Sequence, residues 1–311
     1  MICIVITIAP MYHFDEKHAG LDAGIAVSGN GCGSFLMPLI MESLITEYGW
    51  RGSLLIFSGF VLNIAVCGAL LFKRPIKSQK NRENSKNLSL ANLKVFKNIS
   101  LALFLISQLV FSCGLSTGYV HIAALVEKLT GVERVQSAIV ISTVGILNFL
   151  GRITHGAVAG LQSVNVFHQY GVSCLINAVT LVLLPNIPFY PVSVLLAAIY
   201  GFFIAPYGVL IQLLIPKMVG LDNLKIVYSM FTLFSGIGWI IGAPIAGRLY
   251  NITGNYATSM YFGAATMIGC VILYSKAWAE GSLACQKQVY ETAHHYVVEQ
   301  ENCLRDEKLE V

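Results

Sequence analysis

The chain has 311 residues, of which 56% are hydrophobic and 12% are charged, and its formal net charge is +4. An ordinary soluble domain carries about 25% charged residues, so this composition argues against a soluble enzyme, a nucleic-acid-binding protein or a disordered scaffold. It predicts an all-α integral membrane protein whose apolar helices are solvated by lipid.

Eight windows of the sequence are apolar over about 20 residues, the length that crosses the hydrocarbon core of a bilayer as a helix. In chain order the predicted spans are 23–46, 52–72, 99–126, 137–160, 166–187, 190–215, 227–249 and 257–275. The connections are short and contain turn formers, such as Gly49 and Gly52 in the first and Pro185 and Pro188 in a later one.

A basic segment at 73–98 separates the second predicted span from the third. From Lys73 to Lys97 it holds eight basic residues and one acidic residue, Glu83. Because Lys and Arg are retained on the cytoplasmic side of membranes, we expect a cytoplasmic linker here. Binding of anionic lipid headgroups is the alternative reason for the charge. Six predicted spans follow the linker, so we expect the tail, 276–311, to be cytoplasmic as well.

Glycine pairs at helix-contact spacing occur in several predicted spans, and we expect them to allow close packing of helices. The pairs are Gly29 with Gly33, Gly156 with Gly160, and Gly238 with Gly242. The eight cysteines have no C-x-x-C spacing, so we expect neither a metal site nor a disulfide framework. The sequence also lacks a Walker A loop, H-E-x-x-H and G-x-S-x-G, so we expect no cofactor and no enzyme activity.

Three stretches of the chain resemble the monocarboxylate transporter family of the major facilitator superfamily. The stretch KHAGLDAGIAVSGNGCG (17–33) is similar to the family pattern before and within the fifth span. The stretch YGWRGSLLIFSGFVLNIAVCGALLFKRP (48–75) is similar to the sixth span, and GAPIAGRLYNITGNY (242–256) to the end of the eleventh. Together the three stretches are specific, and the resemblance extends over nearly the whole chain.

The resemblance implies that the eight predicted spans are the fifth to the twelfth of a twelve-helix bundle. Residues 1–72 would then hold the end of the fourth span with the fifth and sixth, and 99–275 would form the C-terminal six-helix half. The acidic-Gly-Gly-Trp motif of the family's first span does not occur in this sequence. We therefore expect an incomplete, N-terminally truncated major facilitator bundle, with substrate bound between two halves that rock against each other.

Arg152 is the most informative ionisable residue within the predicted spans. A guanidinium in hydrocarbon costs at least ~2.5–3.5 kcal/mol on insertion scales, so we expect it to face the bundle interior. Its planar guanidinium can donate two parallel hydrogen bonds to a carboxylate. The resemblance implies that Arg152 takes the place of an eighth-span arginine, and that Asn148, one helical turn earlier, takes the place of an aspartate. The alternative is that Arg152 caps a helix C-terminus or bonds backbone carbonyls inside the bundle.

Asn148 can orient Arg152 or bond a substrate, but it cannot take up a proton. This departure from the family pattern argues against a simple lactate–proton symporter. Family members outside that subgroup handle aromatic amino acids, thyroid hormones, creatine and carnitine, some of them without proton coupling.

Three polar side chains within apolar runs, Tyr119, His121 and Gln212, are further candidates for the substrate site. A satisfied hydrogen bond between helices is an equal alternative for each of them. His121 has a pKa range suited to proton exchange, although a lone histidine is more often structural. Lys17 is a candidate gating residue on the cytoplasmic side.

The sequence thus predicts a secondary transporter that moves monocarboxylates or related small organic solutes across the plasma membrane by alternating access. The alternative is a truncated, non-transporting isoform that modulates a full-length transporter or its trafficking. Candidate partners are a small organic anion or zwitterion as substrate, protons, membrane lipid and a single-span ancillary glycoprotein. Nucleic acid is not among them.

Overall fold

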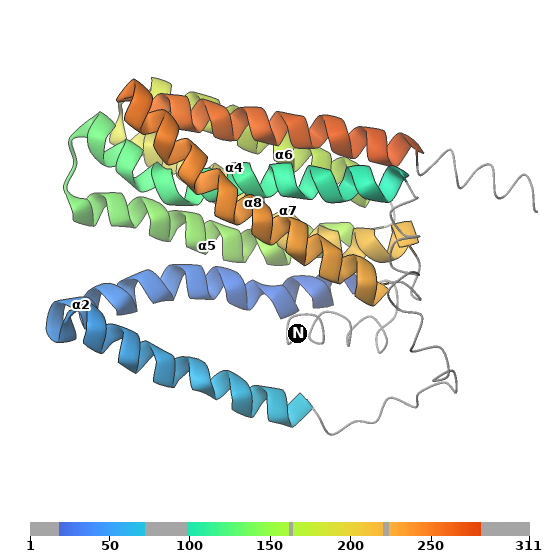
Figure 1. The fold of residues 1–311 in the computed structure, drawn as a ribbon, viewed down its shortest axis with the longest axis horizontal. Coiled ribbons are helices and arrows are strands. Elements are labelled where there is room, and N and C mark those ends of the chain that lie inside the picture. Colours follow the sequence, from blue (N-terminus) through green and yellow to red (C-terminus); the bar gives the residue numbers. More distant parts are fainter. Residues whose placement is uncertain (1–18, 72–98, 162–163, 220–223, 281–311) are drawn as a thin grey trace, which may run out of the picture.

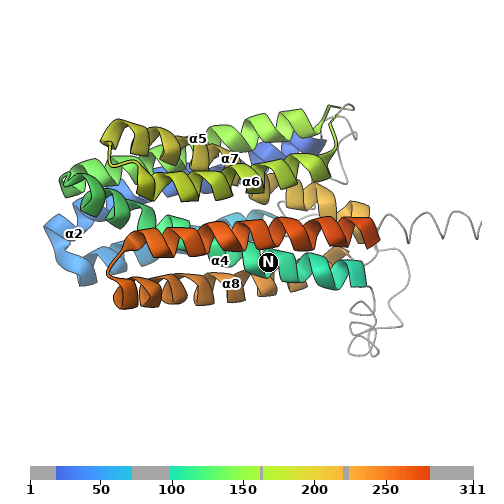
Figure 2. The same cartoon turned by 90° about the horizontal axis from the view of Figure 1, so that it is seen from above.

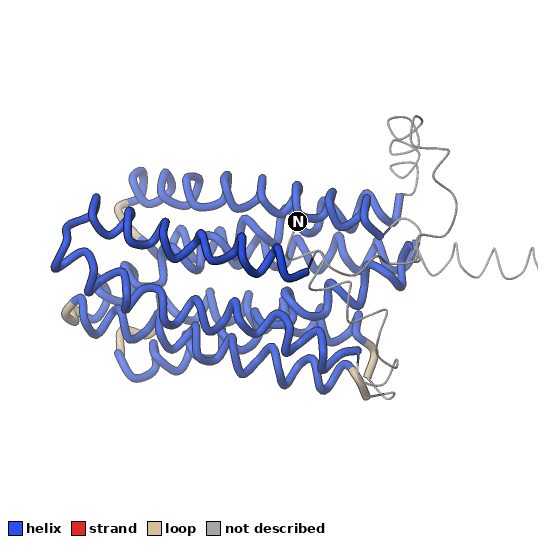
Figure 3. The backbone as a smooth tube through the Cα atoms, turned by 90° about the horizontal axis from the view of Figure 1, so that it is seen from below, coloured by secondary structure: helices blue, strands red, loops and turns tan. Residues whose placement is uncertain are grey.

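A computed structural model describes residues 19–71, 99–161, 164–219 and 224–280, and within them every regular element is helical (Figure 3). The elements are α2 (Ala19–Leu71), α4 (Ile99–Thr130), α5 (Arg134–Ala159), α6 (Val166–Leu183), the 3₁₀ turn η2 (Leu184–Asn186), α7 (Tyr190–Val219), α8 (Leu224–Thr253) and a last helix (Tyr256–Glu280). Lys17, the linker 73–98 and most of the tail lie outside the described residues.

Six of the described helices are long and apolar enough to cross a membrane: α4, α5, α6 with η2, α7, α8 and the last helix. They correspond to the last six predicted spans. The remaining two predicted spans are the two arms of α2, which are helical but are not among the six. The prediction of an all-α, multi-pass membrane protein is confirmed.

Helix α2 is a hairpin of two arms that join at Gly49. The backbone of Gly49 has φ 65° and ψ 172°, a left-handed conformation that glycine adopts without the clash of a side chain. The predicted turn between the first two spans is therefore confirmed. The first arm lies against α5, and the second arm stands apart from the other helices (Figure 1).

The other helices form two groups that pack on each other. Helices α5, α6 and α7 lie on one side, and α4, α8 and the last helix on the other (Figure 2). Large aromatic side chains fill the space between the groups, and Phe104, Phe111, Tyr170 and Tyr200 are almost completely buried. The outer faces carry exposed Ile, Leu and Val side chains, as a helix in contact with lipid requires.

One of the predicted glycine pairs is confirmed in the contact between α8 and α4. A methyl group added at Gly238 would overlap the carbonyl oxygen of Leu109, and one at Gly242 would overlap the backbone of Cys113. Neither position can carry a side chain without separating the two helices. Helices α4 and α8, which belong to the same group, are therefore joined here at backbone-to-backbone distance.

The prediction for Gly29 and Gly33 is wrong. Nothing lies within 4 Å of a methyl group added at either position. The glycines of this arm that touch a neighbour are Gly24 and Gly31, which are seven residues apart and so lie on one face of the helix. The spacing of Gly29 and Gly33 fitted a helix contact, but that face is not the one turned toward α5.

Candidate functional site

The buried face of α5 positions the polar pair that the sequence singled out. Val140, Val144, Asn148 and Arg152 follow one another at intervals of four residues, and all four are buried. Residues at this spacing share one face of a helix. An apolar stripe at the start of α5 therefore continues into an amide and a guanidinium, and the packing that buries the stripe also buries the cation.

The Arg152 side chain is 6% exposed and is held by two hydrogen bonds. Its Nε donates to Oδ1 of Asn148 over 2.8 Å, and its Nη1 donates to the carbonyl oxygen of Val27 over 3.2 Å. The Nδ2 atom of Asn148 in turn donates to the carbonyl oxygen of Gly201 over 3.4 Å. Helices α5, α2 and α7 thus meet at the guanidinium.

Helix α7 makes room for the guanidinium at Gly208. A methyl group added there would overlap Nη1 and lie 2.8 Å from Cζ of Arg152. The hydroxyl groups of Tyr119 and Tyr207 are within electrostatic range of the same cation. We call Arg152, Asn148, Val27 and Gly208 the Arg152 site.

The charge of Arg152 has no counterion among the described side chains, since no carboxylate there forms an ion pair with it. A buried cation without an anionic partner is unfavourable in a medium of low polarity. The guanidinium has five N–H donors in a planar fork, and two of them have acceptors in the described part of the chain. The arrangement is chemically suited to bind an external carboxylate.

A cluster of three hydroxyl groups lies near the Arg152 site, and the sequence analysis missed it. Oγ of Ser112 on α4 lies 2.9 Å from Oγ of Ser235 on α8 and 3.4 Å from the hydroxyl of Tyr207 on α7. Tyr207 and Ser235 are also hydrogen-bonded. Each residue is unremarkable in its own helix, so only the packing of three helices reveals the cluster.

Two of the predicted site residues lie near the Arg152 site. The ring of Tyr119 packs 6.0 Å from the ring of Trp239, and its hydroxyl is within electrostatic range of Arg152. Gln212 is one turn beyond Gly208, and its Nε2 donates to the Gly208 carbonyl over 3.0 Å. Its Oε1 is buried and has no partner in the described part of the chain.

The structure places His121 elsewhere. Its Nε2 lies 3.5 Å from the carbonyl oxygen of Ala243 on α8, and its ring centroid lies 5.8 Å from that of Tyr256 at the start of the last helix. These contacts hold this α4 side chain against α8 and the last helix and not beside Arg152. Lys17 lies outside the described residues.

A buried histidine that the sequence analysis did not single out follows Arg152 by three residues. His155 is 9% exposed, and its Nδ1 lies 2.9 Å from Nε2 of Gln169 on α6. Its ring packs against Phe202 and Phe203 of α7, with centroids 4.9 and 5.8 Å away. Its Nε2 has no partner in the described part of the chain. The only signal in the sequence was a histidine inside an apolar helix.

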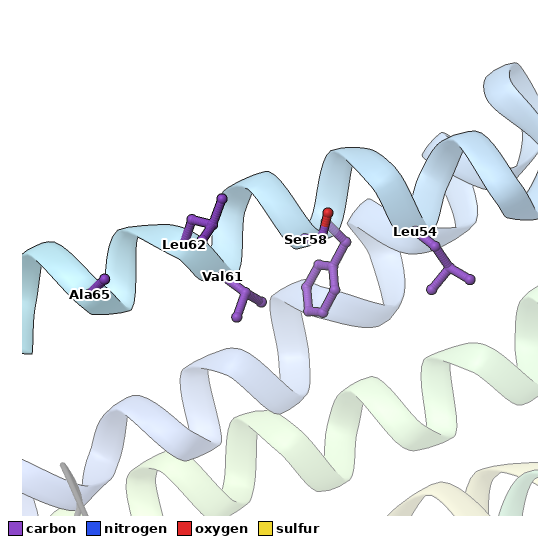
Figure 4. Close-up of a pocket in the computed structure, with 6 residues that line it drawn as sticks. Leu54, Ser58, Val61, Leu62 and Ala65 are labelled. Carbon is purple, nitrogen blue, oxygen red and sulfur yellow. The ribbon is translucent and has the colours of Figure 1, made fainter.

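One hollow of about 600 Å³ lies away from the Arg152 site, along the second arm of α2 (Figure 4). Its lining is almost entirely apolar and consists of Leu54, Phe57, Ser58, Val61, Leu62 and Ala65. No side chain there can bind an ion. Among the described residues, no group of three His, Cys, Asp or Glu side chains is close enough together to hold a metal.

Residues 5–163 match the Major Facilitator Superfamily. Over 89% of its length the chain is 29% identical to monocarboxylate transporter 12 of Xenopus laevis, of which the match covers 65%. It is 25% identical to monocarboxylate transporter 12 of Homo sapiens, covering 88% of this chain and 58% of the relative. It is 27% identical to monocarboxylate transporter 13 of Rattus norvegicus, covering 84% and 60%. The chain thus spans about three fifths of the length of these relatives.

Proposed function

We propose a transport function for this chain on the premise that it belongs to the Major Facilitator Superfamily and, within it, to the monocarboxylate transporter family. The family is one of membrane transporters for small organic solutes, and this chain is a multi-pass membrane protein. The proposed function is secondary transport of a monocarboxylate, or of a zwitterion with one carboxylate, by alternating access.

The observation that carries this proposal is the buried guanidinium of Arg152, which has no carboxylate partner among the described side chains. A substrate carboxylate supplies the missing charge and accepts two parallel hydrogen bonds from the fork. The hydroxyl cluster of Ser112, Tyr207 and Ser235 can receive the rest of a polar solute. Tyr119 and Gln212 would line the same space, whereas His121, which packs against α8 and the last helix, would not.

The amide of Asn148 supports transport without proton coupling at this position. An amide holds Arg152 through Oδ1 but does not titrate, so the bond between them is the same at every physiological pH. If protons are carried, another group has to carry them. The proposal also places the protein in the plasma membrane, with the linker 73–98 and the tail 276–311 in the cytoplasm and Lys17 at the cytoplasmic gate. Lipid and a single-span ancillary glycoprotein are the proposed membrane partners.

The test is uptake of a panel of labelled solutes, namely pyruvate, phenylalanine, creatine and carnitine, by membranes that contain the chain. We expect uptake of at least one of them, and we expect Arg152→Gln to lower it at least about tenfold, since a hydrogen bond to a charged group contributes about 1.5–3 kcal/mol. Arg248→Gln is the matched control, because Arg248 is exposed at the end of α8. Undiminished uptake in Arg152→Gln, at equal amounts of protein in the membrane, would refute the proposal.

A further inference from the structure

The bond between Arg152 and Val27 joins two parts of the chain that are 125 residues apart. Val27 lies on the first arm of α2, and Arg152 lies on α5. These two helices lie side by side in Figure 1. The acceptor is a backbone carbonyl oxygen and not a side chain. The same guanidinium that the proposed function assigns to the substrate therefore holds α2 against α5 when no substrate is bound.

Glycines hold these two helices at a distance that lets the guanidinium reach the Val27 carbonyl. A methyl group added at Gly24 would lie 2.7 Å from the carbonyl oxygen of Arg152, and one at Gly31 would lie 2.7 Å from the Cα and N atoms of Phe149. Val27 is between these two glycines in the sequence, about one turn from each. At these two positions the contact is thus backbone against backbone.

A neutral carbonyl is a weaker partner for this guanidinium than a carboxylate. A hydrogen bond from an ionised donor is already about twice as strong as a neutral one, but a carboxylate also carries the opposite charge and accepts two bonds in parallel from the guanidinium. The Val27 carbonyl accepts one bond and leaves the positive charge uncompensated. A carboxylate that accepts from the same Nη1–H group of Arg152 will therefore displace the carbonyl.

We infer that the carbonyl oxygen of Val27 occupies the position of one carboxylate oxygen of the substrate, so that substrate binding at Arg152 and the contact of α2 with α5 exclude each other. The inference rests on the proposed function for the identity of the substrate. Binding of the anion releases the first arm of α2 from α5, and departure of the anion lets it return. Because such coupling is reciprocal, a change that weakens the contact and leaves Arg152 in place will strengthen substrate binding.

The test measures the contact directly with a pair of cysteines, Phe35→Cys on α2 and Phe149→Cys on α5, in a full-length chain whose eight native cysteines are replaced by alanine. Phe35 packs against Gly145, and Phe149 against Gly31, so the two positions lie diagonally across the contact. A short bifunctional thiol reagent should crosslink them rapidly in solute-free membranes. We expect a transported solute from the panel to slow the crosslinking about tenfold.

Two variants separate the contact from the transport function. In the absence of solute, Arg152→Gln and Gly31→Ala should each slow the crosslinking several-fold, whereas Gly29→Ala and Gly33→Ala should not, because their added methyl groups meet nothing within 4 Å. Gly31→Ala should also lower the half-saturating concentration for uptake about threefold or more, since the Val27 carbonyl then competes less well with the substrate carboxylate for the Arg152 guanidinium. A higher half-saturating concentration would contradict the inference.

The two proposals fail in different ways. Crosslinking that is unchanged by Arg152→Gln in solute-free membranes, or unchanged by a solute that the chain transports, overturns the competition and leaves the transport function standing. Absence of uptake for every solute overturns the transport function. A solute that slows the crosslinking without being transported would still support competition at Arg152.

Discussion

The two arms of α2 belong to one hairpin but have opposite relations to the rest of the protein. The first arm presents Gly24 and Gly31 to α5 and offers a backbone carbonyl to Arg152. The second arm is the more apolar, yet Leu55 and Leu62 on it are 75% and 71% exposed, and a methyl group added at Gly59 would meet nothing within 4 Å. In an apolar solvent, small residues and polar acceptors decide which helix packs on which, and apolar side chains do not.

The largest effect should come from filling the contact of the first arm. Gly31→Leu forces a branched side chain against the backbone of Phe149, where overpacking costs about 1–3 kcal/mol or more. We expect the purified protein to unfold in detergent at a clearly lower temperature and the chain to lose most of its uptake. Gly59→Leu, in the second arm, should change neither. Equal effects of the two variants would show that the arms do not differ as described.

A second change keeps a positive charge at position 152 but replaces the planar guanidinium with an ammonium group. Arg152→Lys retains the cation but cannot reach Asn148 and Val27 at once with a planar fork. We expect uptake to fall about tenfold, with most of the loss in apparent substrate affinity. The corresponding change in an exposed arginine, Arg248→Lys, serves as the control. Uptake measured over a range of solute concentrations distinguishes a loss of apparent affinity from a loss of maximal rate.

Asn148→Asp introduces a carboxylate that competes with both the first arm and the substrate for Arg152. When ionised, the aspartate pairs with the guanidinium one turn away; when protonated at low pH, it releases it. We expect uptake that is several-fold higher at acidic than at neutral pH, whereas the parent chain and Asn148→Ala should respond little. A flat pH profile of uptake in Asn148→Asp would argue against a role for this position beside Arg152.

The smallest effect should follow from Leu62→Ala in the second arm. The side chain is largely exposed, and exposed substitutions usually change the free energy of unfolding by less than about 0.5 kcal/mol. We expect an unchanged melting temperature in detergent and unchanged uptake. A marked fall in the melting temperature or in uptake would mean that another surface covers this arm.

The sequence predicts the helices well because apolar length is a local property. The turn at Gly49 and the six helices from Ile99 to Glu280 follow from runs of apolar residues and the turn formers between them. The hydrogen bond between Arg152 and Asn148 could likewise be predicted from the sequence, since a spacing of four residues places two side chains on one helical face.

Contacts between helices were harder to predict because they depend on which face turns toward a neighbour. The pair Gly29 and Gly33 has the right spacing on the wrong face, whereas Gly24 and Gly31 were passed over. The role of the Val27 carbonyl has no signature in the sequence, because every residue has a backbone carbonyl. The roles of Arg152, Asn148, Tyr119, His121, Gln212 and Lys17 in substrate handling remain predictions for the experiments above.

The approach of Arg152 to α7 also links two positions through evolution. The guanidinium fills the volume that a side chain at position 208 would need. A residue larger than glycine at 208 would therefore require the Arg152 guanidinium to move from this position. Among descendants of a common ancestor, a larger residue at 208 should therefore occur with a guanidinium that has moved or with a smaller residue at 152, whereas a smaller residue at 152 makes no demand on the glycine at 208.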